Sequence, residues 1–518
     1  MRKDLKELYK RKEFLKDDNR KESVKKRHEK GLRTARENIE DLCDRDSFKE
    51  LGSLIIAGQK KRFTQEELIK KTPADGLISG IGEVNNKLFD KNIAKCCILS
   101  YDYTVLAGTQ GGFNHKKTDR LMSMAKKGSN PIIFFVEGGG GRPGDVDFDL
   151  INSGGLDLST WTEYARLSGK VPRIAIVSGY CFAGNAAIAG CSDVIIATSN
   201  SSLGMGGPAM IKEGGLGSFK AEEIGPSKIQ FDNGVIDILV KDENEAVDKT
   251  KQYLSYFQGN LKNWKCNDQN IIQNLIPENR KYAYDVTKII EGIFDKESVL
   301  ELRAGFAKNM VTCLARIEGK PLGIIANSTK YLGGAIDGDG SDKASRFMQL
   351  CNAFNLPIIS FCDTPGFMVG PDHEKLALVR KSARLFLNGA SLSVPIISII
   401  LRKAYGLGSM AMAGGNFHES YLTLSWQTGE FGPMGLEASV KLGFKKELEN
   451  TKNENERDKL YNKLVDEAYE KGKAINAAST MEIDEVIDPK ETRERVTLAL
   501  ENFNFNETKT NTNFIDSW

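Results

Sequence analysis

The sequence predicts an α/β protein that contains two copies of one domain. Two apolar runs, residues 171–177 and 394–401, each end in a glycine-containing turn, and a helical pattern of small residues follows each turn. A strand that passes through a tight turn into a helix is the repeating unit of α/β folds. Elsewhere, short apolar runs also alternate with helical patterns. These observations together predict the α/β class.

The evidence for two copies is an offset of 226 residues that aligns the two halves. It pairs Glu137 with Asp363 and Lys117 with Lys343. The other matches at this offset are Ile132 and Ile133 with Ile358 and Ile359, Phe135 with Phe361, Arg120 with Arg346, and Met122 with Met348. Because this spacing far exceeds the repeat lengths of solenoid proteins, it indicates a duplicated domain. We expect the domains to span residues 1–275 and 276–518.

The chain opens with a basic segment that we expect to be helical over residues 1–45. Residues 1–36 hold 15 Lys and Arg against 7 Asp and Glu, a surplus that could bind phosphate but is more commonly a solvated helix face. The whole chain has a formal net charge of only +2, so no overall field favours nucleic acid or an anionic membrane. No export signal or run of ~18 apolar residues is evident. We therefore expect a cytoplasmic protein.

The first copy is expected to begin with strands and hairpins over residues 76–106, followed by a helix over residues 115–125. Residues 131–136 have the pattern of a buried strand, and residues 137–144 form a glycine-rich loop. Four consecutive glycines let a ligand approach the backbone closely, and Arg142 supplies a fork of donors. This loop is a candidate ligand site, although a flexible linker would have a similar composition.

The rest of the chain continues the alternation of strand and helix. In order, we expect a helix over residues 161–167, strands over 173–177 and 194–197, a polar domain boundary within 260–284, the second copy over about 299–449, a charged helical excursion over 450–473 and a last apolar segment over 474–487. The excursion is most simply a solvated structure. The last segment would return to the second core.

The turn that follows residues 394–401 is the strongest candidate for a functional site. The first N–H groups of a helix lack internal partners, and the helix dipole adds partial positive charge, so the turn suits an oxyanion. Gly406 and Gly408 would allow positive φ or close approach by a substrate. A plain βα turn is the alternative. Because residues 178–190 form a similar turn, we expect two oxyanion sites, which suit a reaction that develops negative charge on two reactants.

Other kinds of chemistry find little support. Nine cysteines without a C-x-x-C pair, and only four histidines, predict no zinc site and reduced thiols. Cys181 lies beside the first turn, but no His or acidic motif accompanies it as a nucleophile would require. The stretch 363–366 (DTPG) resembles a GTPase motif, yet the matching phosphate loop is missing. No G-x-S-x-G motif is present.

Seven motifs along the chain resemble one protein family. They are residues 27–48 (RHEKGLRTARENIEDLCDRDSF), 137–142 (EGGGGR), 179–184 (GYCFAG), 333–347 (GGAIDGDGSDKASRF), 361–367 (FCDTPGF), 402–408 (RKAYGLG) and 475–489 (INAASTMEIDEVIDP). On these motifs the sequence resembles the carboxyltransferase subunits of biotin-dependent acyl-CoA carboxylases, of the propionyl-CoA and methylcrotonyl-CoA type. MGGPAMI, GLGSMAMAGGNFHES and the charged excursion resemble the carboxyltransferase part of long-chain acyl-CoA carboxylases.

The resemblance implies a crotonase-like fold for each half and gives roles to both turns. Ala183 and Gly184 would hold the thioester oxygen of an acyl-CoA while an enolate forms. Leu407 and Gly408 would hold the ureido oxygen of carboxybiotin, whose ureido nitrogen would then take the α-proton. Each site could lower the barrier by ~3 kcal/mol. The other implied binding residues for CoA or biotin are Gly139, Gly140, Gly141, Arg142, Gly206, Gly207, Tyr405 and Gly406.

The resemblance also implies partners, because the sequence has no biotinyl M-K-M site and no ATP-grasp domain. Biotin carboxylase and the biotin carrier would come from another subunit, and no metal is implied in this chain. Family members assemble as dimer-based oligomers, so a homo-oligomer, taken to be a hexamer, would place active sites between subunits. Two alternatives stay open. These are a decarboxylase that serves a membrane sodium pump and an inactive scaffold subunit.

Three departures from the family pattern are visible. Leu407 and Gly408 stand where many relatives have Gly-Ala, which should be harmless if only the N–H groups are used. Met410 occupies a position where many relatives carry Asp and where acyl-chain choice is partly set, so an apolar residue suggests tolerance of a larger chain. Gln230 stands where a His is usual.

Overall fold

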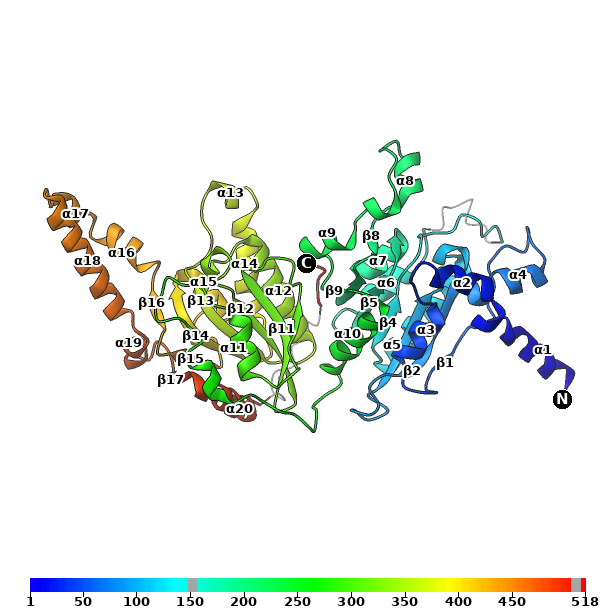
Figure 1. Cartoon of the computed structure of the whole chain (residues 1–518), viewed down its shortest axis with the longest axis horizontal. Coiled ribbons are helices and arrows are strands. Elements are labelled where there is room, and N and C mark those ends of the chain that lie inside the picture. Colours follow the sequence, from blue (N-terminus) through cyan, green and yellow to red (C-terminus); the bar gives the residue numbers. More distant parts are fainter. Residues whose placement is uncertain (148–155, 505–513) are drawn as a thin grey trace. The chain divides into compact units, whose positions relative to one another are not determined.

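The computed structural model describes residues 1–147, 156–504 and 514–518. The chain divides into two compact units, Met1–Gly259 and Asn260–Asp516 (Figure 1). Each unit has its own sheet and its own apolar core. The α/β class predicted from the sequence is confirmed.

The first unit is built on a seven-stranded mixed sheet. In spatial order its strands are β1 (Lys49–Glu50), β2 (Leu77–Glu83), β3 (Lys95–Tyr101), β4 (Ile132–Phe135), β5 (Arg173–Val177), β7 (Val194–Thr198) and β9 (Ile238–Val240). The β1/β2 and β2/β3 pairs are antiparallel, and the later pairs are parallel. Two short strands, β6 (Tyr180–Phe182) and β8 (Ser202–Gly204), form a separate parallel pair.

The helices of the first unit include the expected N-terminal arm. They are α1 (Lys3–Glu13), α2 (Lys21–His28), α3 (Ala35–Leu42), α4 (Gln65–Lys71), α5 (Gly112–Gly128), α6 (Thr160–Ala165), α7 (Gly184–Gly190), α8 (Pro208–Glu213), α9 (Ser227–Asp232) and α10 (Glu243–Ser255). The arm is interrupted rather than continuous because α3 starts at its own capping box. There, Thr34 Oγ1 accepts from Glu37 N–H over 3.1 Å, and Thr34 N–H donates back to the Glu37 carboxylate.

The second unit is built on an eight-stranded mixed sheet. Its strands are β10 (Leu300–Leu302), β11 (Met310–Ile317), β12 (Lys320–Asn327), β13 (Ile358–Thr364), β14 (Ile396–Tyr405), β15 (Leu422–Trp426) and β17 (Glu485–Ile487) in spatial order, with β16 (Glu430–Gly432) paired to the end of β14. The β10/β11 and β11/β12 pairs are antiparallel, and the other pairs are parallel. The central strands are fully buried, as their apolar composition requires.

Ten helices are assigned among the described residues of the second unit. They are α11 (Val286–Ile293), α12 (Gly338–Ala353), α13 (Pro371–Glu374), α14 (Leu378–Ala390), α15 (Gly406–Met412), α16 (Leu436–Gly443), α17 (Lys445–Asn450), α18 (Glu454–Lys471), α19 (Ala474–Ser479) and α20 (Thr492–Asn502). The charged excursion is confirmed as helical, and Figure 1 shows α17 and α18 projecting from the sheet of this unit. The expected return to the second core is also confirmed, because β17 pairs with β15.

The division between the units falls at Gly259, earlier than the expected boundary at residue 275. The reason is apolar packing. Ile272 is fully buried in the core of the second unit, together with Ile276 and Tyr284. A segment that is polar in sequence therefore contributes its few apolar side chains to the second core.

The two sheets share one order of connection. The series β2-β3-β4-β5-β7-β9 and β11-β12-β13-β14-β15-β17 each pass from one antiparallel pair into four parallel pairs. Isolated bridges join Gln110 to Gly141 and Ile336 to Phe367, and these positions also differ by 226 residues. The loops after β4 and β13 consequently occupy matching places in their own sheets. Within the residues that the structure describes, no helix combines the length and apolar character needed to cross a membrane.

Candidate active site: two glycine turns

The first glycine turn joins β6 to α7. Ala183 precedes the helix with φ of 52° and ψ of −121°, a conformation that costs a non-glycine residue roughly 1–3 kcal/mol. Its N–H donates to the carbonyl oxygen of Gly204 over 3.2 Å. The N–H of Gly184, by contrast, has no acceptor among the described residues. Of the two expected donors, the turn leaves Gly184 open.

The glycine-rich loop after β4 lies against this turn. A Cβ atom added to Gly140 would lie 2.6 Å from the Cβ of Ala183 and 3.6 Å from the nitrogen of Gly184. The N–H of Gly139 donates to Ala107 O, whereas the N–H of Gly141 has no acceptor in the part of the chain described. Gly140 has φ of 85° and leaves no room for a side chain against Ala183, and the next residue of the loop, Gly141, supplies a second open N–H.

Arg142 has a different position from the one that a ligand-binding arginine would need. Its side chain is 5% exposed and its Nη1 donates to Asp75 over 2.7 Å, while Asp145 lies 3.6 Å from its Nε. Burial raises the pKa of Asp75 to about 6, although the guanidinium of Arg142 opposes this shift. The arginine is thus committed to holding the glycine loop from inside.

The glycines of the LGMGGP stretch lie beside the same turn. A Cβ on Gly207 would be 3.3 Å from the ring of Phe182, the residue directly before Ala183. Gly206 is half-buried, and its added Cβ would contact Met210. The structure therefore places this stretch next to the first turn.

The second glycine turn joins β14 to α15. Gly406 has φ of 58°, and a Cβ there would lie 2.8 Å from Pro433 O. A Cβ on Gly408 would lie 2.7 Å from Gly366 Cα, so the turn packs directly on the loop after β13. In the described ranges, the N–H groups of Leu407 and Gly408 have no acceptor. The first turn of a helix is where such open donors attract negative charge.

Two neighbours complete the second turn. The N–H of Phe367 is also without an acceptor among the residues described, and its nitrogen would lie 3.0 Å from a Cβ on Gly408. Sequence reasoning missed Phe367, although the 226-residue offset from Gly141 pointed to it. Tyr405 is buried, and its hydroxyl donates to Glu430 over 3.0 Å. This hydrogen bond holds the residue directly before the turn against β16.

A cavity of about 730 Å³ opens beside the second turn. Its lining from the turn consists of Gly406, Ser409 and Met410. Apolar residues elsewhere on its wall are Phe417, Phe431, Pro433, Leu436, Ala468 and Ala477, and polar ones include Lys471, Asn476, Ser479, Thr480 and Glu482. The volume is in the usual range for small-molecule sites.

Thiol chemistry is not supported at the first turn. Cys181 is completely buried, and burial raises its pKa well above the ordinary value for a thiol. All nine cysteines are free. No cluster of three or more His, Cys, Asp or Glu residues that could hold a metal ion occurs in the described part of the chain.

Comparison with known proteins gives consistent matches along the chain. The model of the Carboxyl transferase domain family matches residues 26–514. The 12S subunit of methylmalonyl-CoA carboxyltransferase from Propionibacterium freudenreichii subsp. shermanii is 31% identical over 92% of this chain and 90% of its own length. The alpha subunit of methylmalonyl-CoA decarboxylase from Veillonella parvula is 29% identical over 92% of this chain and 91% of its own length.

Two groups of solved structures agree with these sequence matches. A single-chain, multi-domain long-chain acyl-CoA carboxylase is 51% identical with a TM-score of 0.91, and the match covers 96% of this chain and 49% of that one. This chain thus spans about half the length of that carboxylase. A transcarboxylase 12S structure, described as a hexamer with methylmalonyl-coenzyme A bound, is 30% identical with a TM-score of 0.82 and covers 95% and 92% of the two chains. The chain therefore belongs to the carboxyl transferase domain family, and it is a carboxyltransferase of the kind found in biotin-dependent acyl-CoA carboxylases.

Proposed function

We propose that this chain moves a carboxyl group from carboxybiotin to the α-carbon of an acyl-CoA by stabilising negative charge at its two glycine turns. The observation that carries the proposal is the presence of open main-chain N–H groups at both turns, each at the start of a helix. Fixed N–H donors aimed at a developing oxyanion are worth ~3 kcal/mol or more of barrier. They also need no ionisable side chain.

At the first turn, we assign the thioester oxygen of the acyl-CoA to the N–H groups of Gly184 and Gly141. As the α-proton leaves, negative charge moves from the α-carbon to this oxygen, and the two donors stabilise the enolate. Ala183 has a supporting role, because its N–H already binds Gly204 and its strained backbone sets the direction of the turn. Gly139, Gly140, Gly206 and Gly207 give the thioester close access to the backbone.

At the second turn, we assign the ureido oxygen of biotin to Leu407 and Gly408, with Phe367 as an additional donor. Carboxybiotin supplies the carboxyl group as carbon dioxide, and its ureido nitrogen then accepts the α-proton. The open N–H groups fit an anionic oxygen there, and Gly406 leaves room for the ring. Water must be excluded from the site, because the enolate has to react with carbon dioxide before the carbon dioxide escapes.

The shared order of the two sheets supports the proposal that the halves arose by duplication and that each is crotonase-like. The matching bridges at Gly141 and Phe367 are consistent with this, because they place a donor at the same point of each sheet. In this scheme the first half, proposed as residues 1–275 from the sequence, serves the acyl-CoA and the second half, 276–518, serves carboxybiotin.

The acyl group is proposed to be longer than propionyl. Met410 presents an apolar side chain to the cavity beside the second turn, and that cavity has room for several methylene groups. The 51% identity to a long-chain acyl-CoA carboxylase supports the same choice. A carboxylate at position 410 would instead oppose an apolar chain.

The partners proposed for this chain follow from the family. Biotin carboxylase and the biotin carrier would reside on a separate subunit, in the cytoplasm, and copies of this chain would form a homo-oligomer, taken to be a hexamer as described for the 12S relative. Active sites would then combine the first half of one subunit with the second half of another.

The test is to mix the purified chain with a carboxybiotinylated carrier and acyl-CoA thioesters from acetyl to palmitoyl. We expect carboxylated product, with the highest kcat/KM for long chains. Failure to form product with every chain length would refute the proposed reaction. Highest kcat/KM for acetyl-CoA or propionyl-CoA would refute only the assignment of the cavity.

A decarboxylase is the second candidate, because a methylmalonyl-CoA decarboxylase subunit matches 92% of this chain. It would use the same two turns in the opposite direction. Sodium-dependent loss of carboxyl groups in the presence of a membrane partner would favour this candidate, and activity independent of sodium and membranes would favour the carboxylase.

A further inference from the structure

We propose that two buried carboxylates, Glu137 and Asp363, are positioning residues that each hold one glycine turn and its neighbouring loop in register. The two residues differ by 226 positions. Glu137 lies two residues after the end of β4, at the start of the glycine loop, and Asp363 is the penultimate residue of β13. Both are almost completely buried, with exposures of 4% and 0%. The inference rests on the proposed use of the main-chain donors and adds a reason why they stay in place.

Asp363 lies where the pairing of β13 and β14 is irregular. Cys362 pairs with Ile400 and Thr364 pairs with Ala404, so one residue of β13 faces three residues of β14. Such a bulge leaves main-chain groups without their ladder partners and changes the direction of the strand. Here it lies immediately before Tyr405 and the second turn.

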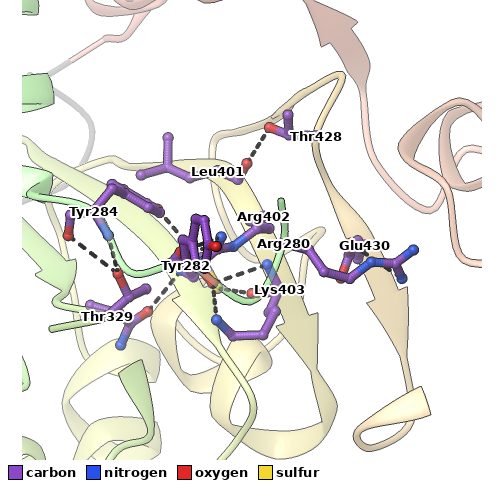
Figure 2. A network of polar contacts seen from close by, with 12 residues as sticks. Arg280, Tyr282, Tyr284, Thr329, Leu401, Arg402, Lys403, Thr428 and Glu430 are labelled. Carbon is purple, nitrogen blue, oxygen red and sulfur yellow. Dashed lines mark hydrogen bonds and ion pairs between the residues drawn. The ribbon is translucent and has the colours of Figure 1, made fainter. Parts of the chain in front are cut away.

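The Asp363 carboxylate binds one main-chain N–H of the bulge and three side chains around it. Its Oδ1 accepts from the N–H of Lys403 over 3.2 Å and pairs with Lys403 Nζ over 2.7 Å. Its Oδ2 accepts from Arg402 Nε over 3.1 Å and from the hydroxyl of Tyr284 over 2.8 Å. Figure 2 shows Tyr284, Arg402 and Lys403 gathered in this network.

This network connects both pieces of the second site. Asp363 is three residues before Gly366 and four before Phe367, while Arg402 and Lys403 lead directly into Gly406. The turn and the loop are in close contact, because a Cβ on Gly408 would already touch Gly366. A small shift of the turn or of the loop would therefore change the distance between the N–H groups of Gly408 and Phe367. Arg402 also donates to Tyr282 O over 3.0 Å, which further restrains its guanidinium.

Glu137 plays the equivalent part in the first unit, but its arginine comes from the N-terminal arm. Arg27 of α2 forms a two-pronged pair with the Glu137 carboxylate over 2.8 and 2.5 Å. Arg27 also donates to Arg33 O over 2.8 Å, and Glu243 lies 3.7 Å away. The arm therefore has a specific task, which its basic composition alone did not reveal.

Glu137 opens the glycine loop and contacts two other segments, the approach to the first turn at Gly179 and the turn that ends at Gly108. A Cβ on Gly179 would overlap its Oε1, and a Cβ on Gly108 would lie 2.6 Å from its carbonyl oxygen. Gly179 is five residues before Gly184. The carboxylate thus packs against the segment that leads into α7, and the main-chain carbonyl of the same residue packs against Gly108.

The test measures carboxyl transfer from a carboxylated acyl-CoA to free biotin, using malonyl-CoA, methylmalonyl-CoA or a long-chain 2-carboxyacyl-CoA, whichever the wild type accepts. For Asp363→Asn we expect kcat to fall by roughly 10–100-fold, as for a misplacement of about 1 Å, with a higher KM for biotin and an unchanged KM for the thioester. For Glu137→Gln and Arg27→Met we expect the opposite split, a higher KM for the thioester only.

Asp295→Asn and Asp193→Asn are matched controls. Asp295 and Asp193 are buried in arginine pairs with Arg493 and Arg173, away from the turns. We expect these controls to lower thermal stability without changing either KM. If the Asp363 and Glu137 variants matched the controls, or raised both KM values alike, the inference would be wrong.

Two milder substitutions cover the case in which the charge variants do not fold. Tyr284→Phe removes one donor from Asp363, and Arg27→Lys keeps the charge but loses the two-pronged geometry. We expect a smaller rise in the KM for biotin with Tyr284→Phe and in the KM for the thioester with Arg27→Lys. Normal kinetics in both variants would overturn the inference. A wild-type chain without any transfer activity would instead refute the proposed function.

Discussion

At the scale of single residues, the structure gives Arg142 and Asp75 roles that their residue types alone did not predict. Arg142 was predicted from the sequence to offer its donors to a ligand, because it follows four glycines. In the structure, the guanidinium of Arg142 instead donates a hydrogen bond to the buried carboxylate of Asp75. The carboxyl group of Asp75 is fully buried, and this loss of solvent raises its pKa more than the neighbouring guanidinium of Arg142 lowers it.

The buried Asp75 leads to a prediction about pH. Burial raises its pKa in the folded protein to about 6 from an ordinary 3.8, so the folded state binds this proton more tightly than the unfolded state does. Its contribution to stability is therefore greatest below about pH 4, falls as pH rises to about 6, and is constant above that. Over this range the wild type should lose up to about 3 kcal/mol relative to Asp75→Asn.

Urea unfolding of the wild type and Asp75→Asn at a series of pH values between 4 and 7 measures this difference. The gap between the two free energies of unfolding should change steadily below pH 6 and then level off. A gap that is the same at every pH would show that Asp75 does not titrate in this range.

At the scale of elements, the second site depends on how closely α15 approaches the loop after β13. The helix begins with two glycines within three residues, and each removes a side chain that would meet backbone. Gly406 lies under Pro433 O, and Gly408 lies on Gly366 Cα. This contact, rather than the length or polarity of the helix, sets the distance between the open N–H groups.

Gly408→Ala tests this contact. The new Cβ would be 2.7 Å from Gly366 Cα, so helix and loop must separate while every N–H is retained. We expect turnover to fall about 100-fold, the loss typical of a shift near 1 Å in a catalytic geometry. Gly443→Ala is the matched control, since a Cβ there meets nothing within 4 Å. Equal rates for the two variants would contradict the packing argument.

Much of the element order was predictable from local pattern, and the exceptions have physical causes. The strands at 173–177 and 194–197 were predicted because short, wholly apolar runs bounded by turns seldom form anything but buried strands. The arm was predicted as helical, but not its division at the Thr34 capping box. The segment 260–284 was predicted as the domain boundary because it is polar, whereas the structure includes it in the second unit, where the buried Ile272 joins the core.

Only those parts of the site that depend on local sequence could be predicted. Glycines and helix starts mark the two turns, so Gly184, Leu407 and Gly408 could be proposed from the sequence. Which N–H groups remain open depends on partners far away in sequence. The Gly204 carbonyl that engages Ala183 is 21 residues later, and the role of Phe367 depends on the path of a loop, so neither could be predicted from local sequence.

At the scale of the whole molecule, the proposed carboxyltransferase uses main-chain donors in each of two similar units and takes its base from a reactant. The family assignment, the sheet orders and the open N–H groups agree with this description. The duplication and the division of tasks between the halves stay proposals. If they hold, the reaction depends on individual main-chain N–H groups at the two turns.

The most direct measurement compares kcat for Leu407→Pro with kcat for Leu407→Ala. Leu407 is 62% exposed, and proline is tolerated in the first turn of a helix, so the proline variant removes one N–H while the alanine variant removes only the side chain. We expect Leu407→Pro to lose roughly 100-fold in kcat and Leu407→Ala to stay close to the wild type. Equal rates for the two variants would contradict the claim that main-chain hydrogens at this turn stabilise the reaction.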